Sequence, residues 1–286
     1  MARFSPLPDR RPAIVAGASS GIGAATALEL AKRGFPVALG ARRVEKCEEL
    51  VEQIKTAGGE AIALPLDVTS AESVTAFVAD ATKALGDIEV LVAGAGDTNF
   101  GKLHEMTTEE FTDQLQIHLV GANRMAGAVV QGMIERQRGD LIFVGSDVSL
   151  RQRPHMGAYG AAKAGLVAMV TNYQMELEGT GVRASIVHPG PTMTSMGWSL
   201  PAEKIGPALE DWAKWGQARH DYFLRAADLA RAITFVAETP RGGYIANLEI
   251  QPEAPLTKTT DRQKLALGEE GMPGHSAGMS EAKGEK

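Results

Sequence analysis

The chain has 286 residues, 44% of them hydrophobic and 22% charged, and a formal net charge of −6 at pH 7. This composition is typical of a soluble globular protein with room for one large domain or two small ones. The acidic balance argues against a nucleic-acid-binding protein, which needs a basic face, and no apolar run approaches the ~18 residues of a membrane span.

Short apolar strands alternate with helices from residue 12 to residue 250. We expect strands at residues 12–16, 36–40, 61–66, 88–92, 141–144, 182–187 and 244–250. Helices are expected at residues 24–33, 44–57, 71–85, 108–136 and 226–238, with one more around Tyr159 and Lys163. This alternation predicts an α/β fold of the Rossmann type, a doubly wound parallel seven-stranded sheet with helices on both faces.

The alternation is not interrupted by a linker, so residues 12–250 are expected to form a single domain. A loose lead-in at residues 1–11 would precede it, and a polar extended tail at residues 251–286 would follow. The N-terminal residues lack the apolar core of a secretion signal, and the single cysteine, Cys47, can form no internal disulfide. We therefore expect a cytoplasmic protein, and we assign no metal-binding residues.

A glycine-rich turn at residues 17–23 joins the first strand to the first helix. Small residues let the backbone approach a pyrophosphate, and the N–H groups at a helix N-terminus attract it. The alternative is a tight turn that only packs the helix on the strand, but the strand–turn–helix context favours nucleotide binding.

Two arginines, Arg42 and Arg43, follow the second strand, where dinucleotide folds usually carry an acidic residue that holds the adenosine ribose. A guanidinium suits a 2′-phosphate, which NAD lacks, so we expect NADP(H). The alternative is a pair of solvated arginines at a helix start.

Later strand ends carry further candidate ligand-binding residues. Asp67, beside Val68, either borders an adenine ring, caps the next helix, or does both. Small residues at 93–96 leave room for a ligand beside the fourth strand. The turn at Pro189 and Gly190 lies past the sixth strand, at the edge where ligands bind in open α/β sheets.

The fifth strand leads to a candidate catalytic group. Ser146 follows this strand, and Tyr159 and Lys163 lie four residues apart on one face of an alanine-rich helix. Tyrosine titrates near pH ~10, and a positive neighbour favours the phenolate, so we expect Lys163 to make Tyr159 a usable acid or base nearer neutrality. The alternative is an exposed amphipathic face with no catalytic role.

Residues 195–225 lose the alternating pattern and form either a substrate lid or an extra pair of packed helices. This segment and the residues just before it hold all three tryptophans of the chain and two of its 11 methionines: Trp198, Trp212, Trp215, Met193 and Met196. A lid of this composition suggests an apolar substrate, although the same residues could serve packing alone.

These motifs together resemble the short-chain dehydrogenase/reductase family over about residues 11–250. The family's Thr-Gly-x-x-x-Gly-x-Gly stands here as residues 16–23, with alanine in place of threonine. Its Tyr-x-x-x-Lys is Tyr159 with Lys163, and its serine, thirteen residues before the tyrosine, is Ser146. Its Pro-Gly motif is residues 189–190.

Two further departures from the family pattern concern the candidate site. The family's Asn-Asn-Ala-Gly is Ala-Gly-Ala-Gly at residues 93–96, and its catalytic asparagine aligns with His118. In this family a chain of water molecules passes protons from the lysine to the solvent. In this position His118 would either brace a water molecule of that relay or join the relay itself, and a histidine in the relay would titrate near its usual pKa of ~6.5. Alternatively, it would pack against the helix while a backbone carbonyl holds the water.

The resemblance implies an oxidoreductase that transfers a hydride between NADP(H) and a carbonyl compound or secondary alcohol. Ser146 would bind the substrate oxygen, Tyr159 would be the general acid/base, and Lys163 would hold the nicotinamide ribose. The implied cofactor-binding residues, from pyrophosphate through 2′-phosphate, adenine and ribose to nicotinamide, are Gly17, Ser19, Ser20, Gly21, Ile22, Gly23, Arg42, Arg43, Asp67, Val68, Ala93, Gly94, Ala95, Tyr159, Lys163, Pro189, Gly190, Thr192 and Thr194.

The resemblance also implies a homodimer or homotetramer, because family members commonly assemble in this way. The implied partner is a small-molecule carbonyl or alcohol substrate, with no nucleic acid and no membrane. Two other functions stay open: a nucleotide-binding regulatory protein without turnover, and a dehydratase or epimerase on the same fold.

Overall fold

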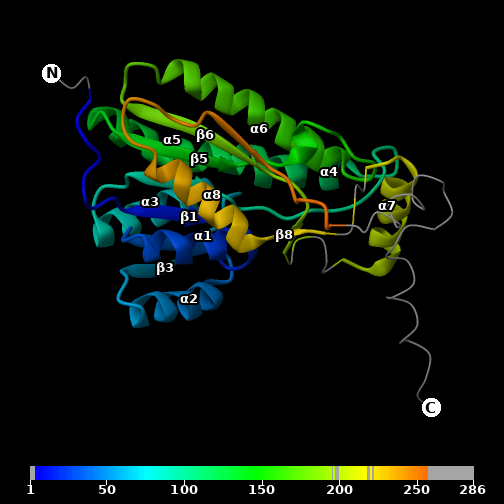
Figure 1. Cartoon of the computed structure of the whole chain (residues 1–286), viewed down its shortest axis with the longest axis horizontal. Coiled ribbons are helices and arrows are strands. Elements are labelled where there is room, and N and C mark those ends of the chain that lie inside the picture. Colours follow the sequence, from blue (N-terminus) through cyan, green and yellow to red (C-terminus); the bar gives the residue numbers. More distant parts are fainter. Residues whose placement is uncertain (1–3, 195, 197–199, 218–219, 221, 257–286) are drawn as a thin grey trace, which may run out of the picture.

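The computed structural model describes residues 4–194, 196, 200–217, 220 and 222–256. Its centre is a seven-stranded sheet in the order β3-β2-β1-β4-β5-β6-β9, in which all neighbours are parallel (Figure 1). The strands are β1 (Ala13–Ala16), β2 (Val37–Ala41), β3 (Ala61–Pro65), β4 (Val90–Ala93), β5 (Gly139–Val144), β6 (Val182–Pro189) and β9 (Asn247–Ile250). The predicted Rossmann-type fold is confirmed.

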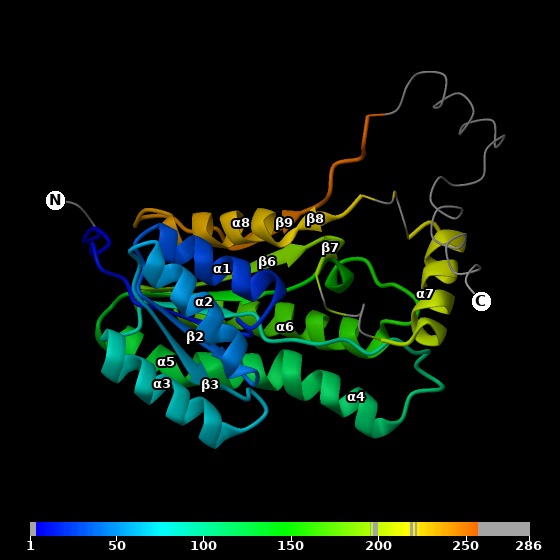
Figure 2. The ribbon, with the colours of Figure 1, turned by 90° about the horizontal axis from the view of Figure 1, so that it is seen from below.

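Helices cover both faces of this sheet (Figure 2). They are α1 (Gly21–Lys32), α2 (Val44–Thr56), α3 (Ala71–Leu85), α4 (Thr108–Leu115), α5 (Gly121–Glu135), α6 (Gly157–Glu176), α7 (Ala202–Lys214) and α8 (Ala226–Glu238). One core lies between the sheet and α3, α5 and α6, and the other between the sheet and α1, α2 and α8. Alternate residues of β1 enter the two cores, Ile14 the first and Val15 the second, because successive side chains of a strand point to opposite faces.

Several element boundaries differ from the sequence-based expectations. The helix expected at residues 108–136 is broken into α4 and α5 by a π-helical turn at Gln116–Val120, and β9 starts at Asn247 instead of residue 244. Ser70 caps α3 by accepting from the Ser73 amide, whereas Asp67 binds Thr69 two residues on, so Asp67 does not cap this helix. Local hydrogen bonds of this kind leave little trace in hydrophobic periodicity.

A second, small sheet was not foreseen from the sequence. It pairs β7 (Thr192–Met193) with β8 (Leu224–Arg225) and so holds together the two ends of the segment at residues 195–225. In the described part, this segment contains one helix, α7, rather than the helix pair that was the alternative to a lid. Trp198 lies outside the described residues, as does the expected tail from residue 257 onward.

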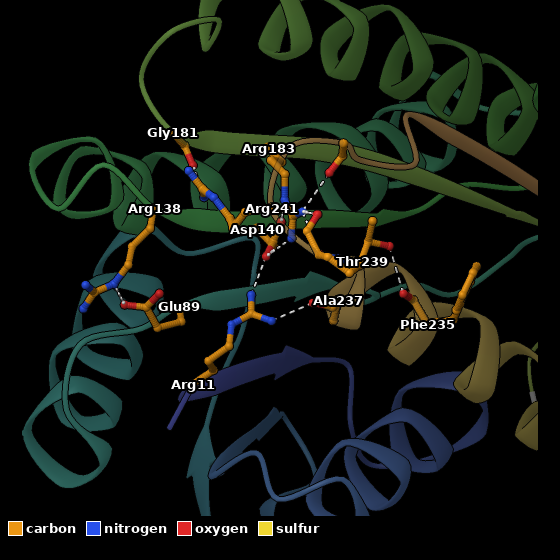
Figure 3. A network of polar contacts seen from close by, with 12 residues as sticks. Arg11, Glu89, Arg138, Asp140, Gly181, Arg183, Phe235, Ala237, Thr239 and Arg241 are labelled. Atoms are coloured by element: carbon orange, nitrogen blue, oxygen red, sulfur yellow. Dashed lines mark hydrogen bonds and ion pairs between the residues drawn. The ribbon is translucent and has the colours of Figure 1, made fainter. Parts of the chain in front are cut away.

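The edge of the sheet at the start of β5 and β6 carries a buried ion network (Figure 3). The Asp140 carboxylate accepts from Arg11 and from Arg183, whose Nε and Nη2 lie 2.5 Å and 2.9 Å from its two oxygens. Arg183 also donates to the Thr239 carbonyl, and Arg11 to the Ala237 carbonyl. The lead-in was expected to be loose through residue 11. Instead Arg11 is buried, and its hydrogen bond to the Ala237 carbonyl fixes it against the C-terminal end of α8.

Among the described residues, no helix combines the length and the apolar composition needed to cross a bilayer.

Candidate active site

Three side chains meet where β5 ends and α6 begins. The Ser146 and Tyr159 hydroxyls are hydrogen-bonded to each other, and Lys163 Nζ lies 5.7 Å from the centroid of the Tyr159 ring. Lys163 Nζ donates to the Val144 carbonyl at 2.7 Å. All three residues are buried, which rules out the alternative of an exposed amphipathic face. The i, i+4 spacing on α6 and the end of β5 thus bring a hydroxyl, a phenol and an amine together.

Burial controls the protonation of these groups. It raises the pKa of Tyr159 to about 12, against the opposing effect of the hydrogen bond with Ser146, and it lowers the pKa of Lys163 to about 7. The expectation that Lys163 brings the phenol closer to neutrality is therefore contradicted for this structure. The physical reason is desolvation, which disfavours the phenolate and the ammonium alike.

His118 lies in the π-helical turn, where Gly121 N–H donates to the carbonyl of Gln116. Its Nε2–H donates to the Asp97 carbonyl at 2.5 Å, so the imidazole is the tautomer whose Nδ1 carries a lone pair. Within the described structure, this buried Nδ1 has no hydrogen-bond partner. The ring stands edge-on to Tyr159, and Gly96 makes room for it, because a Cβ at Gly96 would lie 2.6 Å from His118 Cε1.

The pKa of His118 is lowered to about 3, first by burial and then by Lys163, while the bond to Asp97 opposes the shift. The imidazole is therefore neutral at ordinary pH, and the expected titration near ~6.5 is contradicted. A cavity of about 10 Å³ lies between His118 and Lys163, with Ala93 and Ala95 also lining it. This volume is close to the least that holds one water molecule.

The glycine loop fits tightly against the end of β4. Gly17 has a φ of +84°, and a Cβ there would lie 2.7 Å from Ala95 Cα, while a Cβ on Gly23 would lie 2.2 Å from the Gly17 carbonyl oxygen. The small residues expected to leave room for a ligand at 93–96 thus also make room for this loop. Helix α1 begins inside the loop at Gly21, with no acidic residue in its first turn, so its N-terminus can attract an anion.

Arg43 extends over the glycine loop from the end of β2. Its Nη2 donates to the Ser19 and Ser20 hydroxyls at 3.1 and 3.2 Å. Both arginines are exposed, but the hydrogen bonds to the two serines come from Arg43. The pKa of Asp67 is lowered mainly by two hydrogen bonds from Thr69, with a smaller contribution from Arg42. The structure therefore separates the two arginines, and Arg43 is the one beside the candidate phosphate site.

The residues after β6 return toward the glycine loop. Gly190 N–H donates to the Ile250 carbonyl, and the Thr192 hydroxyl donates to the Gly190 carbonyl, both at 2.8 Å. Thr194 lies against the loop, since a Cβ on Gly21 would be 3.3 Å from Thr194 Cβ. Val68 is buried beside the π-helical turn on the other side of the site.

Helix α7 supplies an aromatic wall beside Tyr159. Trp212 meets Phe100 edge to face at 5.6 Å, and both pack against the cluster of Val148, Met156 and Tyr159. The Trp212 Nε1–H donates to the Pro154 carbonyl at 2.7 Å. Trp212 therefore stabilises the packing of α7 as well as forming part of this wall. Trp215, in contrast, is 61% exposed, and Met193 is 55% exposed.

A second cavity, of about 340 Å³, lies between α7 and the loop that follows β4. Phe100 forms part of its lining and also packs against the Tyr159 cluster. Sequence reasoning missed Phe100, as it missed the ion pair of Asp147 and Arg153 beside Ser146. No motif marks these residues, and only their contacts reveal them. No group of metal-ligating side chains occurs among the residues described here.

Comparisons with known proteins agree with this geometry. The family model for short chain dehydrogenases matches residues 11–205. The chain is 32% identical over 255 residues to the glycine betaine reductase ATRR of Emericella nidulans, covering 87% of this chain but only 20% of that protein's length. It is also 32% identical to a 3-oxoacyl-[acyl-carrier-protein] reductase of Synechocystis, covering 82% of this chain and 91% of the relative.

Among solved structures, an alcohol dehydrogenase from Thermococcus sibiricus complexed with 5-hydroxy-NADP matches with a TM-score of 0.74 and 30% sequence identity. The match covers 87% of this chain and 100% of that one.

Proposed function

This chain belongs to the short-chain dehydrogenase/reductase family of oxidoreductases, and we propose that it interconverts a carbonyl compound and a secondary alcohol with NADP(H). The observation that carries the proposal is the buried contact of Ser146, Tyr159 and Lys163. When bound, the cofactor supplies or accepts the hydride. Ser146 holds the substrate oxygen, and Tyr159 gives that oxygen a proton during reduction and takes it back during oxidation.

The residues present fit a dinucleotide. Gly17 and Gly23 let the loop close on the end of β4 and on itself, because a Cβ on either would clash with backbone atoms. The loop held in this way ends at the N-terminus of α1, where backbone N–H groups suit a pyrophosphate. On the other side of the site, Lys163 is proposed to hold the nicotinamide ribose. Thr192 and Thr194, after β6, are proposed to lie on the nicotinamide side.

The proposed preference for NADP(H) rests on Arg43. Its guanidinium already contacts Ser19 and Ser20, and a 2′-phosphate at that point would receive charge-assisted hydrogen bonds. NAD offers no phosphate there, so Arg43 would discriminate between the two cofactors. The complex of the Thermococcus sibiricus alcohol dehydrogenase with 5-hydroxy-NADP supports the same preference.

His118 is proposed to act as a neutral residue. Its bond to the Asp97 carbonyl braces the turn after β4, and its lone pair at Nδ1 can accept a hydrogen bond from a water molecule in the relay. The role of a titrating acid is not proposed, because the pKa is about 3. Asp67 and Val68 are proposed to border the adenine.

The substrate is proposed to carry an apolar group beside its carbonyl. Phe100, Trp212 and Met156 pack around the Tyr159 ring and would favour such a group over a charged one. A cytoplasmic homodimer or homotetramer is proposed on the family resemblance.

The test is an NADPH-oxidation screen over ketones, aldehydes, quinones and sugars, followed through the nicotinamide absorbance. Tyr159→Phe is the matched control, because it keeps the ring and removes the acid. Turnover that requires Tyr159 supports the redox enzyme. Cofactor binding without turnover on any carbonyl compound would favour the regulatory alternative, and conversion without net change in the nicotinamide would favour the dehydratase or epimerase.

A further inference from the structure

A buried ion pair lies directly beside the candidate catalytic serine. Asp147 follows Ser146, and its two carboxylate oxygens accept from Arg153 Nη1 at 3.1 Å and Nη2 at 2.6 Å. The side chains of Asp147 and Arg153 are only 3% and 13% exposed. A planar guanidinium that meets a carboxylate through two parallel bonds fixes orientation as well as charge.

The same pair joins three parts of the fold. The guanidinium carbon of Arg153 lies 5.7 Å from the centroid of the Trp212 ring on α7. Gln251, which follows β9, donates to Asp147 Oδ2 at 3.3 Å. Arg153 thereby links the loop after Ser146 to the aromatic wall, and Asp147 links the loop to the end of the sheet.

We propose that Arg153 is a positioning residue for the reaction at Tyr159. By holding Asp147 it keeps the loop after Ser146 in place, and it cancels a negative charge that would otherwise face the phenol. This inference rests on the proposed function, since it assigns Arg153 a role in that reaction. Neither residue belongs to the motifs that identified the site.

Few charged groups surround Tyr159 in the described structure. The loop after β5 contributes Asp147 and Arg153, α6 contributes Lys163, and the π-helical turn contributes the neutral His118. Helix α7 presents Trp212, while its Asp211 is paired with His155. After burial and the bond with Ser146, Asp147 raises the pKa of Tyr159 and Arg153 lowers it. The paired charges thus act in opposite directions on the same phenol.

The test is the rate of alcohol oxidation at pH 9, which needs the phenolate of Tyr159. Because the pKa of Tyr159 is about 12, the phenolate is a minor species at pH 9 and the rate is proportional to it. Arg153→Gln leaves Asp147 unpaired, and the rate should fall about tenfold. Asp147→Asn leaves Arg153 unpaired, and the rate should rise by a similar factor, an increase that loss of loop order alone would not give. The double variant Asp147→Asn/Arg153→Gln should return close to the wild-type rate, and Arg153→Lys, which keeps the charge, should change it least.

Arg151→Gln is the matched control, because Arg151 lies in the same loop but pairs with Glu249 at the surface. Its rate at pH 9 should equal that of the wild type. The double variant has no unpaired buried charge, so it keeps the test decisive if a single variant unfolds: its rate must stay near the wild-type value. Rates that do not change, or that change in the same direction in both single variants, overturn the inference. Failure of the proposed function is distinguishable, because the wild type itself would then show no nicotinamide-linked turnover.

Discussion

The rings of His118 and Tyr159 meet edge to face, with centroids 4.9 Å apart and planes at 89°. Each ring covers one edge or face of the other, and burial raises the pKa of Tyr159 while it lowers that of His118. The two residues share one buried environment, and the pKa of each depends on it.

His118→Asn should remove a source of acid instability. The pKa of His118 is about 3 in the folded chain and near ~6.5 when unfolded, so between these values the unfolded state binds more protons. The contribution to stability is complete above pH ~6.5 and is lost as the pH falls toward 3. Between pH 7 and pH 4.5, urea unfolding should show the wild type losing about 2 kcal/mol more than the variant. Parallel losses would contradict this assignment.

Arg43→Ala should raise the Kd of NADPH about 10- to 100-fold, because it removes a charge-assisted contact worth ~1.5–3 kcal/mol. NADH binding should hardly change, because NADH has no 2′-phosphate. Arg42→Ala is the control, since Arg42 makes no contact with the glycine loop in the described structure, and it should have a smaller effect. Titration of the wild type and both variants with NADPH and with NADH measures this, and equal losses for both variants would refute the separate role of Arg43.

Tyr159→Phe should lower turnover by about 10²–10⁴, the range of a positioned acid or base, and leave cofactor affinity intact. Lys163→Met should reduce both, because the amine is proposed to hold the nicotinamide ribose and also lines the small cavity beside His118, next to the Tyr159 ring. Steady-state kinetics with cofactor titration separate the two outcomes. Full turnover in Tyr159→Phe would mean that the proton comes from another group.

Asp140→Ala should destabilise the fold by about 3–5 kcal/mol, since it leaves Arg11 and Arg183 buried without their shared carboxylate. Arg10→Gln removes an exposed pair with Glu60 on the same edge and should cost no more than about 1 kcal/mol. Urea unfolding of both variants gives the comparison. The folded fraction of Asp140→Ala should retain NADPH binding, because the network lies at the opposite edge from the glycine loop.

Local sequence determined the framework of the site. Apolar runs bounded by glycine predicted the parallel sheet, because a strand buried on both faces leaves a continuous hydrophobic signature. The four-residue spacing of Tyr159 and Lys163 placed both on one face of α6, since helix geometry is regular. The glycine turn and the pair of Arg42 and Arg43 were likewise visible in the sequence, because each follows a strand end, but only the structure separated the two arginines.

Tertiary structure alone decided the protonation states and the supporting contacts. The pKa values of Tyr159, Lys163 and His118 follow from burial by segments far apart in the chain, so no local pattern contains them. The pairing of Arg153 with Asp147 depends on the path of one loop, and its contact with Trp212 depends on where α7 packs. A sequence states which groups can ionise, but desolvation by the assembled fold sets which of them do.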